Sequence, residues 1–530
     1  MKFLLSSVPP WFPDQPYLSV PLLTGILKDK GYEVVQKDIN LSFYDCFTSK
    51  KELLYQYEQF LGNKKRAHID KKFELLIDSK EYIIDQIQSY KDEIRTLEYY
   101  KNKKEIAEAF KQIDIALKVF GLNYTETILS LGDIDYSFNY LDASDAIDFS
   151  LRNNIFSYFF RKYELEDIVR LNIDVVGFSI ITPKQLIPAI SFSNIIKSVL
   201  PNVKIVLGGP YISRVGLVLM QEPRFNRLID YVLSGYGEKS IIDFANALTN
   251  PSDTLFSVPG LIYKNSNEIN HNENSDIENI YENIPCPDFD GLFALHYFSP
   301  VIQLPLEISK ACYWNRCKFC ELRNLKYAEK PVDVILNEIK QLIVKYGTNY
   351  FSFVSASPSP KLLLKIADQI SENKLKIKWS TMIRAEKYIN EDFAQKLYAG
   401  GLRLVMIGIE SGSQKVLDLM DKGIDIKTSE KCLHVLFKTG IYVHAYFMFG
   451  FNGEDNSDID KTISFINKNQ SYFNSIAFSY YTELNVNFNK DNIGIYLDNN
   501  NNLSDLNNAI RKLKKDYSLP NTLNTQILFS

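Results

Sequence analysis

The chain has 530 residues and a formal net charge of −4, with 45% hydrophobic, 13% aromatic and 23% charged residues. A chain of this length is too long to fold around one ordinary hydrophobic core, and it predicts roughly three or four domains. The apolar and aromatic content excludes extended disorder. Because acidic residues slightly outnumber basic ones, the overall charge does not favour a phosphate backbone, and nucleic acid is not an expected partner. We expect a peptide or a small molecule as the substrate.

The amino terminus predicts a first strand rather than a secretory signal. Its apolar run, Met1 to Leu5, breaks at Ser6-Ser7, and Pro9-Pro10 follows without a small-residue cleavage site. No apolar run in the chain reaches the ~18 residues that span a bilayer. These features predict a cytoplasmic protein that has no membrane association and keeps its thiols reduced.

Residues 1–50 and 164–265 alternate buried-strand patterns with helical patterns, which predicts a doubly wound, Rossmann-like α/β domain. The expected strands cover residues 2–8, 33–40, 173–180, 203–207 and 228–234. Gly208-Gly209-Pro210 follows the fourth strand, and Gly235-Tyr236-Gly237-Glu238 follows the fifth. Gly208, Gly209 and Gly235 would allow a ligand to approach the backbone at the carboxyl ends of the strands, although a turn without a ligand explains these residues equally well.

Two segments interrupt or follow this first domain. Residues 51–163 are charged and glycine-poor and have helical periodicity, so they predict a helical insertion. Their Lys and Glu runs are typical of solvated helix faces, and a partner-binding surface is the alternative. An Asn-rich polar stretch from Lys264 to Asn283 then indicates a boundary, and residues 266–300 are predicted to be a linker.

Residues 301–485 again alternate strands with helices, which predicts a complete or partial βα barrel with its chemistry at the carboxyl ends of the strands. The expected strands cover residues 304–308, 350–354, 376–381, 403–409 and 442–449, and the expected helices cover residues 332–346, 361–371, 390–399, 414–420, 429–439 and 458–467. Residues 486–530 form an Asn-rich tail with a late helix at 503–517.

Three of the six cysteines, Cys312, Cys317 and Cys320, lie within nine residues directly after the strand at 304–308. In a reducing compartment, such a group favours a metal or iron–sulfur site over a disulfide. Three thiolates hold three irons of a four-iron cluster and leave the fourth iron open for a substrate or cofactor.

Zinc is the competing interpretation of these thiols. A closed zinc site normally has a fourth Cys or His ligand, and Cys286 and His296 lie upstream as candidates. Cys46 and Cys432 stand alone in apolar patterns and are predicted to be buried structural residues.

The segment from Cys312 to Cys320 resembles the cluster loop of radical SAM enzymes. The usual spacing there is CxxxCxxC with an aromatic residue before the last cysteine, which is Phe319 here, whereas this chain has CxxxxCxxC. The resemblance extends to the preceding α/β domain, which is similar to cobalamin-binding domains, and to four further matches: Tyr327, Gly408 to Ser413, Met420-Asp421-Lys422-Gly423, and Phe449 to Glu454.

The resemblance implies a 4Fe-4S cluster held by Cys312, Cys317 and Cys320, with S-adenosylmethionine (SAM) bound to the open iron. An external electron donor of the flavodoxin or ferredoxin type would supply the electron that splits SAM into methionine and a radical, which removes hydrogen from an unactivated carbon.

The resemblance also suggests which residues hold SAM. Phe319 would contact the adenine, Arg384 the SAM carboxylate, and Glu410 the ribose or the amino group; ordinary ion pairs at strand ends are the alternative for Arg384 and Glu410. Relatives often carry an acidic residue after the second barrel strand, where this chain has Ser355-Ala356-Ser357-Pro358.

Cobalamin is implied by the N-terminal resemblance, but without the histidine ligand of classical DxHxxG domains. An Asp two positions before a histidine is absent at all five histidines: His68, His271, His296, His434 and His444. By analogy with the family, we expect an enzyme that methylates a carbon of a peptide or another natural product. The alternatives are a radical rearrangement, oxidation or cross-link without methyl transfer, and a zinc-stabilised interaction protein.

Overall fold

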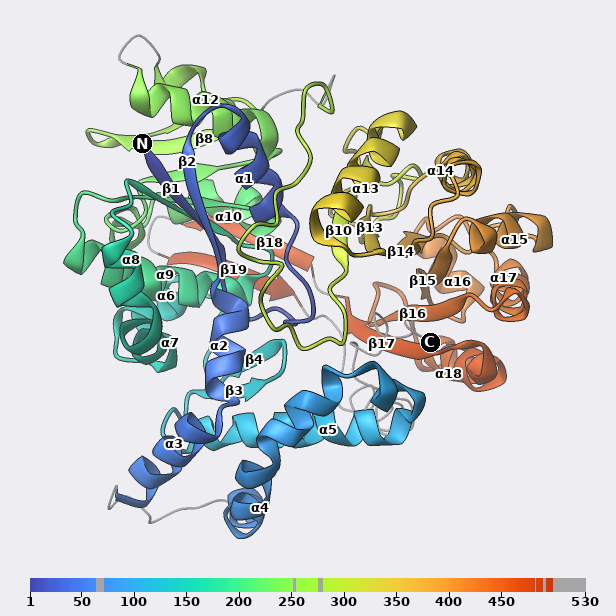
Figure 1. Cartoon of the computed structure of the whole chain (residues 1–530), viewed down its shortest axis with the longest axis horizontal. Helices are drawn as coiled ribbons and strands as arrows, with labels where there is room; N and C mark the ends of the chain where they lie inside the picture. The colour runs from blue at the N-terminus through green and yellow to red at the C-terminus, as the bar shows by residue number, and fades with distance from the viewer. Residues whose placement is uncertain (63–70, 251–253, 275–279, 482, 490–491, 499–530) are drawn as a thin grey trace. The chain divides into compact units, whose positions relative to one another are not determined.

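The structure is a computed structural model that describes residues 1–62, 71–250, 254–274, 280–481, 483–489 and 492–498 (Figure 1). The chain divides into two compact units, of which the first contains Met1–Pro300 and the second contains Val301–Leu484. No helix within the described residues is long and apolar enough to cross a membrane. The helix predicted at residues 503–517 lies outside the described residues.

The first unit is built on a seven-stranded sheet with the order β2-β1-β5-β6-β7-β8-β9. Its strands are β1 (Lys2–Ser7), β2 (Glu33–Asp38), β5 (Val175–Ser179), β6 (Lys204–Gly208), β7 (Tyr231–Leu233), β8 (Leu261–Asn265) and β9 (Glu268–His271). The first five of these strands are parallel, and β1 lies between β2 and β5. The strand order therefore reverses at the β1–β5 boundary, as in a doubly wound fold, and this confirms the predicted fold class.

Helices cover both faces of this sheet (Figure 1). Helices α1 (Ser19–Asp29) and α12 (Gly237–Thr249) pack together on one face, and their apolar side chains join those of β1, β5 and β6 in a single core. The central strand β5 is buried over most of its length because both of its faces are covered, which explains its continuous apolar sequence. On the other face lie α9 (Pro183–Val199) and α10 (Pro210–Leu219).

The structure adds strand pairs that the sequence patterns did not predict: two hairpins in the part of the chain before residue 272, and the pairing of β18 (Glu483–Asn489) with β19 (Asn492–Asp498) in the segment expected to be a tail. Strands β8 and β9 are antiparallel, so the sheet is mixed, and the polar stretch that starts at Lys264 is partly an edge hairpin. Its turn is tight, with Ser266 at φ 55°. Only Leu261–Tyr263 of β8 form a buried apolar run, whereas the end of β8 and most of the edge strand β9 carry polar residues, so the apolar pattern is too short to predict this hairpin.

The second hairpin, β3 (Thr127–Ser130) with β4 (Asp133–Tyr136), lies within the segment that was expected to be helical. Gly132 at its turn packs against Phe12 in the loop after β1. Lys184, in the first turn of α9, forms ion pairs with Asp133 at 2.8 Å and Asp135 at 2.9 Å. The hairpin therefore contacts segments that follow β1 and β5, where the strand order of the sheet reverses.

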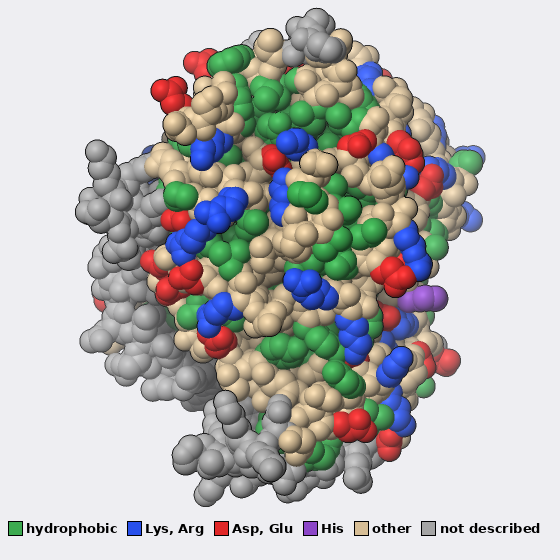
Figure 2. All heavy atoms as spheres, turned by 90° about the vertical axis from the view of Figure 1, so that its left-hand side faces the viewer, with side chains coloured by type: hydrophobic (Ala, Val, Ile, Leu, Met, Phe, Trp, Pro, Cys, Tyr) green, Lys and Arg blue, Asp and Glu red, His purple; other side chains and the backbone are tan. Residues whose placement is uncertain are grey.

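Most of the described residues between 39 and 170 outside this hairpin are helical, as predicted for residues 51–163. The helices are α2 (Ile39–Phe47), α3 (Lys50–Gly62), α4 (Lys71–Ile94), α5 (Lys103–Leu117), α6 (Ala143–Leu151), α7 (Ile155–Phe159) and α8 (Leu165–Arg170). On the face of the molecule in Figure 2, Lys and Arg side chains are interspersed with acidic and hydrophobic ones and do not gather in one patch.

The second unit contains a six-stranded parallel sheet with the order β10-β13-β14-β15-β16-β17, so each of its strands lies beside the previous one in the chain. The strands are β10 (Leu304–Glu307), β13 (Tyr350–Val354), β14 (Lys378–Ile383), β15 (Leu402–Glu410), β16 (Tyr442–Phe449) and β17 (Ser475–Tyr480). The helices are α13 (Val332–Tyr346), α14 (Pro360–Glu372), α15 (Glu391–Ala399), α16 (Gln414–Leu419), α17 (Ile426–Thr439) and α18 (Asn456–Asn469). This alternation confirms the predicted partial βα barrel.

The two faces of this sheet differ in exposure. On β15 and β16, Val405, Ile407 and Phe447 are buried, whereas the alternate residues Met406 and Tyr446 are partly exposed. Because successive side chains of a strand point to opposite faces, the buried set belongs to the helix-covered outer face and the partly exposed set to the inner face. The strand registers place four inner residues in one row across neighbouring strands: Met382, Met406, His444 and Ser475.

Candidate functional site

The three predicted thiols lie on one loop at the carboxyl end of β10. This cysteine loop, defined here as residues Cys312–Cys320, is closed at its base by antiparallel pairing of β11 (Ser309–Lys310) with β12 (Ala328–Glu329). Cys312 forms a parallel bridge with Ser357, which follows β13. Cys317 is buried, and Cys312 and Cys320 are partly buried. The loop therefore lies over the ends of two neighbouring strands.

A second segment, the turn Met420–Gly423, holds the other end of the cysteine loop. The Lys318 backbone amide donates to the Met420 carbonyl at 2.9 Å, and the Trp314 indole Nε1 donates to the Asp421 carbonyl at 2.9 Å. Arg316 forms an ion pair with the Asp421 carboxylate at 3.1 Å. We call this segment the clamp turn. The clamp turn follows α16 and belongs to the segments that resemble the family, but the sequence pattern does not predict these contacts.

Arg384 follows β14 and reaches both the cysteine loop and the clamp turn. Its guanidinium Nη1 lies 3.7 Å from the Cys317 Sγ, and Nη2 donates to the Lys422 carbonyl. Its Nε pairs with the Glu386 carboxylate. The side chain is almost fully buried, so these partners satisfy a charge that has little access to water.

Glu410 ends β15 in a left-handed backbone conformation with φ 67°. Its carboxylate accepts from the Lys422 Nζ at 2.8 Å, and both side chains are about 90% buried. The same ammonium lies 5.5 Å from the ring centroid of Phe319. Gly408 leaves the space for this pair, because a Cβ at Gly408 would overlap the Glu410 carboxylate.

Lys422 thus connects three of the residues predicted to bind SAM. Its side chain contacts Glu410 and faces Phe319, and its carbonyl accepts from Arg384. The sequence places Lys422 within the family-like segment Met420–Gly423 but does not predict a role for its side chain. Arg384 pairs with Glu386, and Glu410 pairs with Lys422, as the alternative interpretation of strand-end ion pairs predicts.

Burial and nearby cations act in opposite directions on the thiols. Desolvation raises the pKa of Cys317, while Lys422 and Arg384 oppose this shift by favouring the thiolate. Desolvation also raises the pKa of Cys320. Because thiols must lose their protons to bind iron, the two buried cations would favour metal uptake and compensate the negative charge of the ligands.

The residues present fit an iron–sulfur cluster better than a single zinc ion. Within the described part of the chain, no three His, Cys, Asp or Glu side chains are gathered as ligands of one metal ion. A four-iron cluster instead distributes its thiolates over different irons.

Ser355 directly follows β13, at the position where radical SAM enzymes often carry an acidic residue. Its hydroxyl shares a hydrogen bond with Ser309, at the base of the cysteine loop. Nearby, the Tyr327 hydroxyl accepts from the Ser359 amide at 2.7 Å and donates to the Glu329 carboxylate at 2.9 Å. These contacts connect the base of the loop to the segment after β13.

The carboxyl group of Glu454, in the motif that follows β16, has a pKa above its ordinary value. Burial raises the pKa of Glu454 to about 7, although the Gly450 amide donates to one carboxylate oxygen. The folded state therefore keeps a proton that the unfolded chain releases above about pH 4.5. We expect the free energy of unfolding to fall, relative to that of Glu454→Gln, as the pH rises from about 4.5 to about 7.

Chemical denaturation of the wild type and of Glu454→Gln at about pH 5 and about pH 8 measures this difference. Gln has no ionisable proton, so the variant should lack this part of the pH dependence. Parallel pH profiles for the two proteins would contradict the shift.

In the first unit, the three predicted glycines differ in what requires them. Gly209 has φ 106°, and its Cβ would lie 2.5 Å from the Ile180 carbonyl oxygen, so backbone packing alone excludes a side chain there. Gly235 has φ 81° and lies against Asn274. At Gly208, a Cβ would meet only the Leu233 carbonyl, at 3.7 Å, so packing does not explain this glycine.

Hydroxyl groups surround these glycines. Ser213 accepts from the Gly235 amide at 2.9 Å and donates to the Gly209 carbonyl at 3.0 Å, and Ser179 at the end of β5 shares a hydrogen bond with Ser19. The loops directly after β1, β5, β6 and β7 contain no histidine. Backbone groups and serine hydroxyls therefore line this edge of the sheet.

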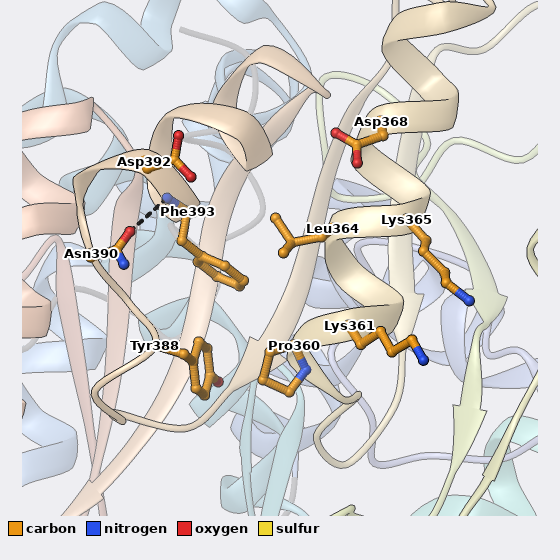
Figure 3. A pocket seen from close by; sticks show the side chains of 9 residues that line it. All are labelled: Pro360, Lys361, Leu364, Lys365, Asp368, Tyr388, Asn390, Asp392 and Phe393. Atoms are coloured by element: carbon orange, nitrogen blue, oxygen red, sulfur yellow. Dashed lines mark hydrogen bonds between the residues drawn. The ribbon is translucent and has the colours of Figure 1, made fainter.

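A cavity of about 480 Å³ lies elsewhere in the second unit, between α14 and the segment that leads into α15 (Figure 3). Leu364, Phe393, Tyr388 and Pro360 face it, and none of the three thiols lines it. The Tyr388 hydroxyl donates to the Arg384 carbonyl at 3.2 Å, so the cavity borders the segment that carries Arg384. The chemistry-bearing residues are at the strand ends, and we place the site there.

Comparisons with known proteins agree with this location. Residues 306–466 match the profile of the Radical SAM superfamily. The chain is 26% identical over 308 residues to an uncharacterized methyltransferase of Pyrococcus horikoshii, covering 57% of this chain and 65% of the relative. It is 22% identical over 310 residues to an anaerobic magnesium-protoporphyrin IX monomethyl ester cyclase of Cereibacter sphaeroides, covering 56% of this chain and 50% of the relative. The chain thus matches about half to two thirds of the length of these curated relatives.

Among solved structures, the radical SAM methyltransferase TsrM from Kitasatospora setae, with cobalamin and a [4Fe-4S] cluster bound, has a similar fold. The TM-score is 0.56 at 13% identity, and the similarity covers 91% of this chain and 75% of that one. The fold resemblance therefore includes both units.

Proposed function

We propose that this chain, a radical SAM enzyme whose N-terminal region resembles cobalamin-dependent radical SAM enzymes, methylates an unactivated carbon of a natural product with cobalamin as the methyl carrier. The observation that carries the proposal is the position of three thiols on one loop over the strand ends, with Arg384 and the Lys422–Glu410 pair beside them. Relatives that are named as a methyltransferase and as a cyclase support the chemistry.

The residues of the second unit would hold the cluster and SAM. Cys312, Cys317 and Cys320 are the ligands for a 4Fe-4S cluster, which with SAM supplies one-electron cleavage of a carbon–sulfur bond when both are bound. Arg384 and Lys422 provide positive charge where a SAM carboxylate would bind, and Phe319 offers an aromatic surface for the adenine.

The inner face of the barrel would receive the substrate. In its central row, Met382 and Met406 are partly exposed. His444 and Ser475 in the same row are buried and contact each other, with the His444 Nδ1 2.9 Å from the Ser475 hydroxyl. Thioether and aromatic side chains favour contact with apolar groups. A small, largely apolar molecule fits this face better than a peptide does, and the cyclase relative also acts on a small molecule by its name.

In the first unit, the edge that carries Gly208, Gly209 and Gly235 would hold cobalamin. The absence of histidine from the loops at this edge means that the protein would bind the cofactor without an imidazole ligand. An external donor of the flavodoxin or ferredoxin type would supply electrons, in a cytoplasmic setting where such donors and free thiols coexist.

Anaerobic purification and reconstitution test the proposal. We expect about four irons and four labile sulfides per chain, copurified cobalamin, and formation of 5'-deoxyadenosine from SAM. Transfer of label from methyl-labelled SAM to a product would establish methylation. Cleavage of SAM without cobalamin and without a methylated product would instead support a rearrangement, oxidation or cross-link, and zinc without labile sulfide would refute the radical SAM assignment.

A further inference from the structure

We infer that Trp314 is a positioning residue that holds the cysteine loop, with its extra residue, against the clamp turn. Four residues separate Cys312 from Cys317, one more than in the usual family spacing. The inference rests on the proposed role of the thiols as cluster ligands, and it concerns how the protein itself arranges two of them before iron binds.

The indole of Trp314 is held on several sides. Its Nε1 donates to the Asp421 carbonyl at 2.9 Å. The guanidinium of Arg384 lies 4.6 Å from a Trp314 ring centroid, and that of Arg316 lies 5.0 Å from it. Each cation is attracted to the negative face of the aromatic ring. Because Arg384 also contacts the Cys317 thiol, the position of the indole is coupled to that of a ligand.

Gly423 creates the space for this indole. It has φ 70°, and a Cβ at this position would overlap the six-membered ring of Trp314. Asp421, two residues earlier, has φ 51° and presents both its carbonyl to Trp314 and its carboxylate to Arg316. A non-glycine residue in the left-handed region is uncommon, so the clamp turn adopts a costly conformation in order to make these contacts.

Asn315 absorbs the additional length. It has φ 53°, a conformation that asparagine tolerates better than most residues, and its side-chain amide donates to the Leu325 carbonyl at 2.6 Å. On one side of this local turn, the Tyr313 amide donates to the Ser357 carbonyl at 3.3 Å. On the other side, Lys318 is bonded to Met420. The extra residue is therefore confined between two anchors, and both cysteines keep fixed neighbours.

The test compares two variants at the contact between Trp314 and Gly423 with a control variant at a glycine elsewhere in the chain. Trp314→Ala removes the indole, and Gly423→Ala fills its place from the opposite side. Gly347→Ala is the control, because Gly347 has φ 67° but no atom within 4 Å of an added Cβ. It reproduces the backbone strain of Gly423→Ala without touching the cysteine loop.

The first readout is the rate at which iodoacetamide alkylates Cys317 in the cluster-free protein, measured by peptide mass spectrometry. Cys317 is 7% exposed, so alkylation requires the loop to open. We expect roughly a tenfold faster reaction in Trp314→Ala and Gly423→Ala, and no change in Gly347→Ala. The second readout is iron bound per chain after reconstitution, which should fall in the same two variants.

Equal alkylation rates in the wild type and Trp314→Ala would overturn the inference, as would an equal increase in Gly347→Ala. If Trp314→Ala fails to fold by circular dichroism, Trp314→Phe replaces it, because it keeps an aromatic face but loses the Nε1 donor and should give a smaller increase. Faster alkylation in the variants, together with a wild type that takes up no iron, would support the positioning role and refute the proposed function.

Discussion

Cys317→Ala is expected to reduce 5'-deoxyadenosine formation to the level of a protein-free control and to lower the iron content sharply. Cys317 is the buried member of the three thiols and the one that contacts Arg384. Its removal leaves two protein ligands for a cluster that needs three, and it leaves the Arg384 guanidinium facing an apolar methyl group. After anaerobic reconstitution, an iron assay measures the metal content, and chromatography of the SAM cleavage products measures 5'-deoxyadenosine formation.

Cys46→Ala is the matched control for this variant. Cys46 lies in the first unit, and burial raises the pKa of its thiol to about 12, so it is a poor metal ligand. The control should retain iron and SAM cleavage. Undiminished 5'-deoxyadenosine formation in Cys317→Ala would contradict the ligand assignment.

Lys422→Met is expected to lower the free energy of unfolding by about 3–5 kcal/mol, because it leaves the Glu410 carboxylate buried without its cation. The double variant Lys422→Met with Glu410→Gln removes both charges and should regain much of this loss. Urea denaturation of the cluster-free proteins measures the difference.

Lys396→Met provides the comparison for a solvent-exposed pair. Lys396 pairs with Asp392 within α15, and both side chains are at least half exposed, so its loss should cost less than about 1 kcal/mol. If the double variant at Lys422 and Glu410 proved as unstable as Lys422→Met alone, the unpaired carboxylate would not be the cause of the instability.

The sequence predicted the main architecture because long apolar strands and amphipathic helices leave strong periodic patterns. The buried run of β5 and the apolar segment of β16 are examples. The hairpins β3–β4 and β8–β9 were missed because their strands are short and mix buried apolar residues with exposed ones. Pairing of backbone groups at an edge requires no hydrophobic pattern.

The candidate site was predictable where its reactive residues lie close together in the sequence. Cys312, Cys317 and Cys320 are conspicuous because three thiols occur within nine residues. The partners of Trp314 and Glu410 were not predictable, since Asp421 is 107 residues from Trp314 and Lys422 reaches Glu410 through a connection that only the fold defines. Periodicity reports which face of an element is buried, but it does not report which two elements meet.

The order of strands in the two sheets implies different routes of folding. In the second unit each strand pairs with the one made just before it, so its sheet grows by successive addition of neighbours. In the first unit β1 pairs with β5, and the register joins Phe3 to Val175 across the whole helical insertion. Closing so long a loop lowers the chain entropy before the contacts between β1 and β5 form, and this slows folding. We therefore expect the first unit to be the slower to fold, with one edge of β1 open to wrong pairing until β5 has been synthesised.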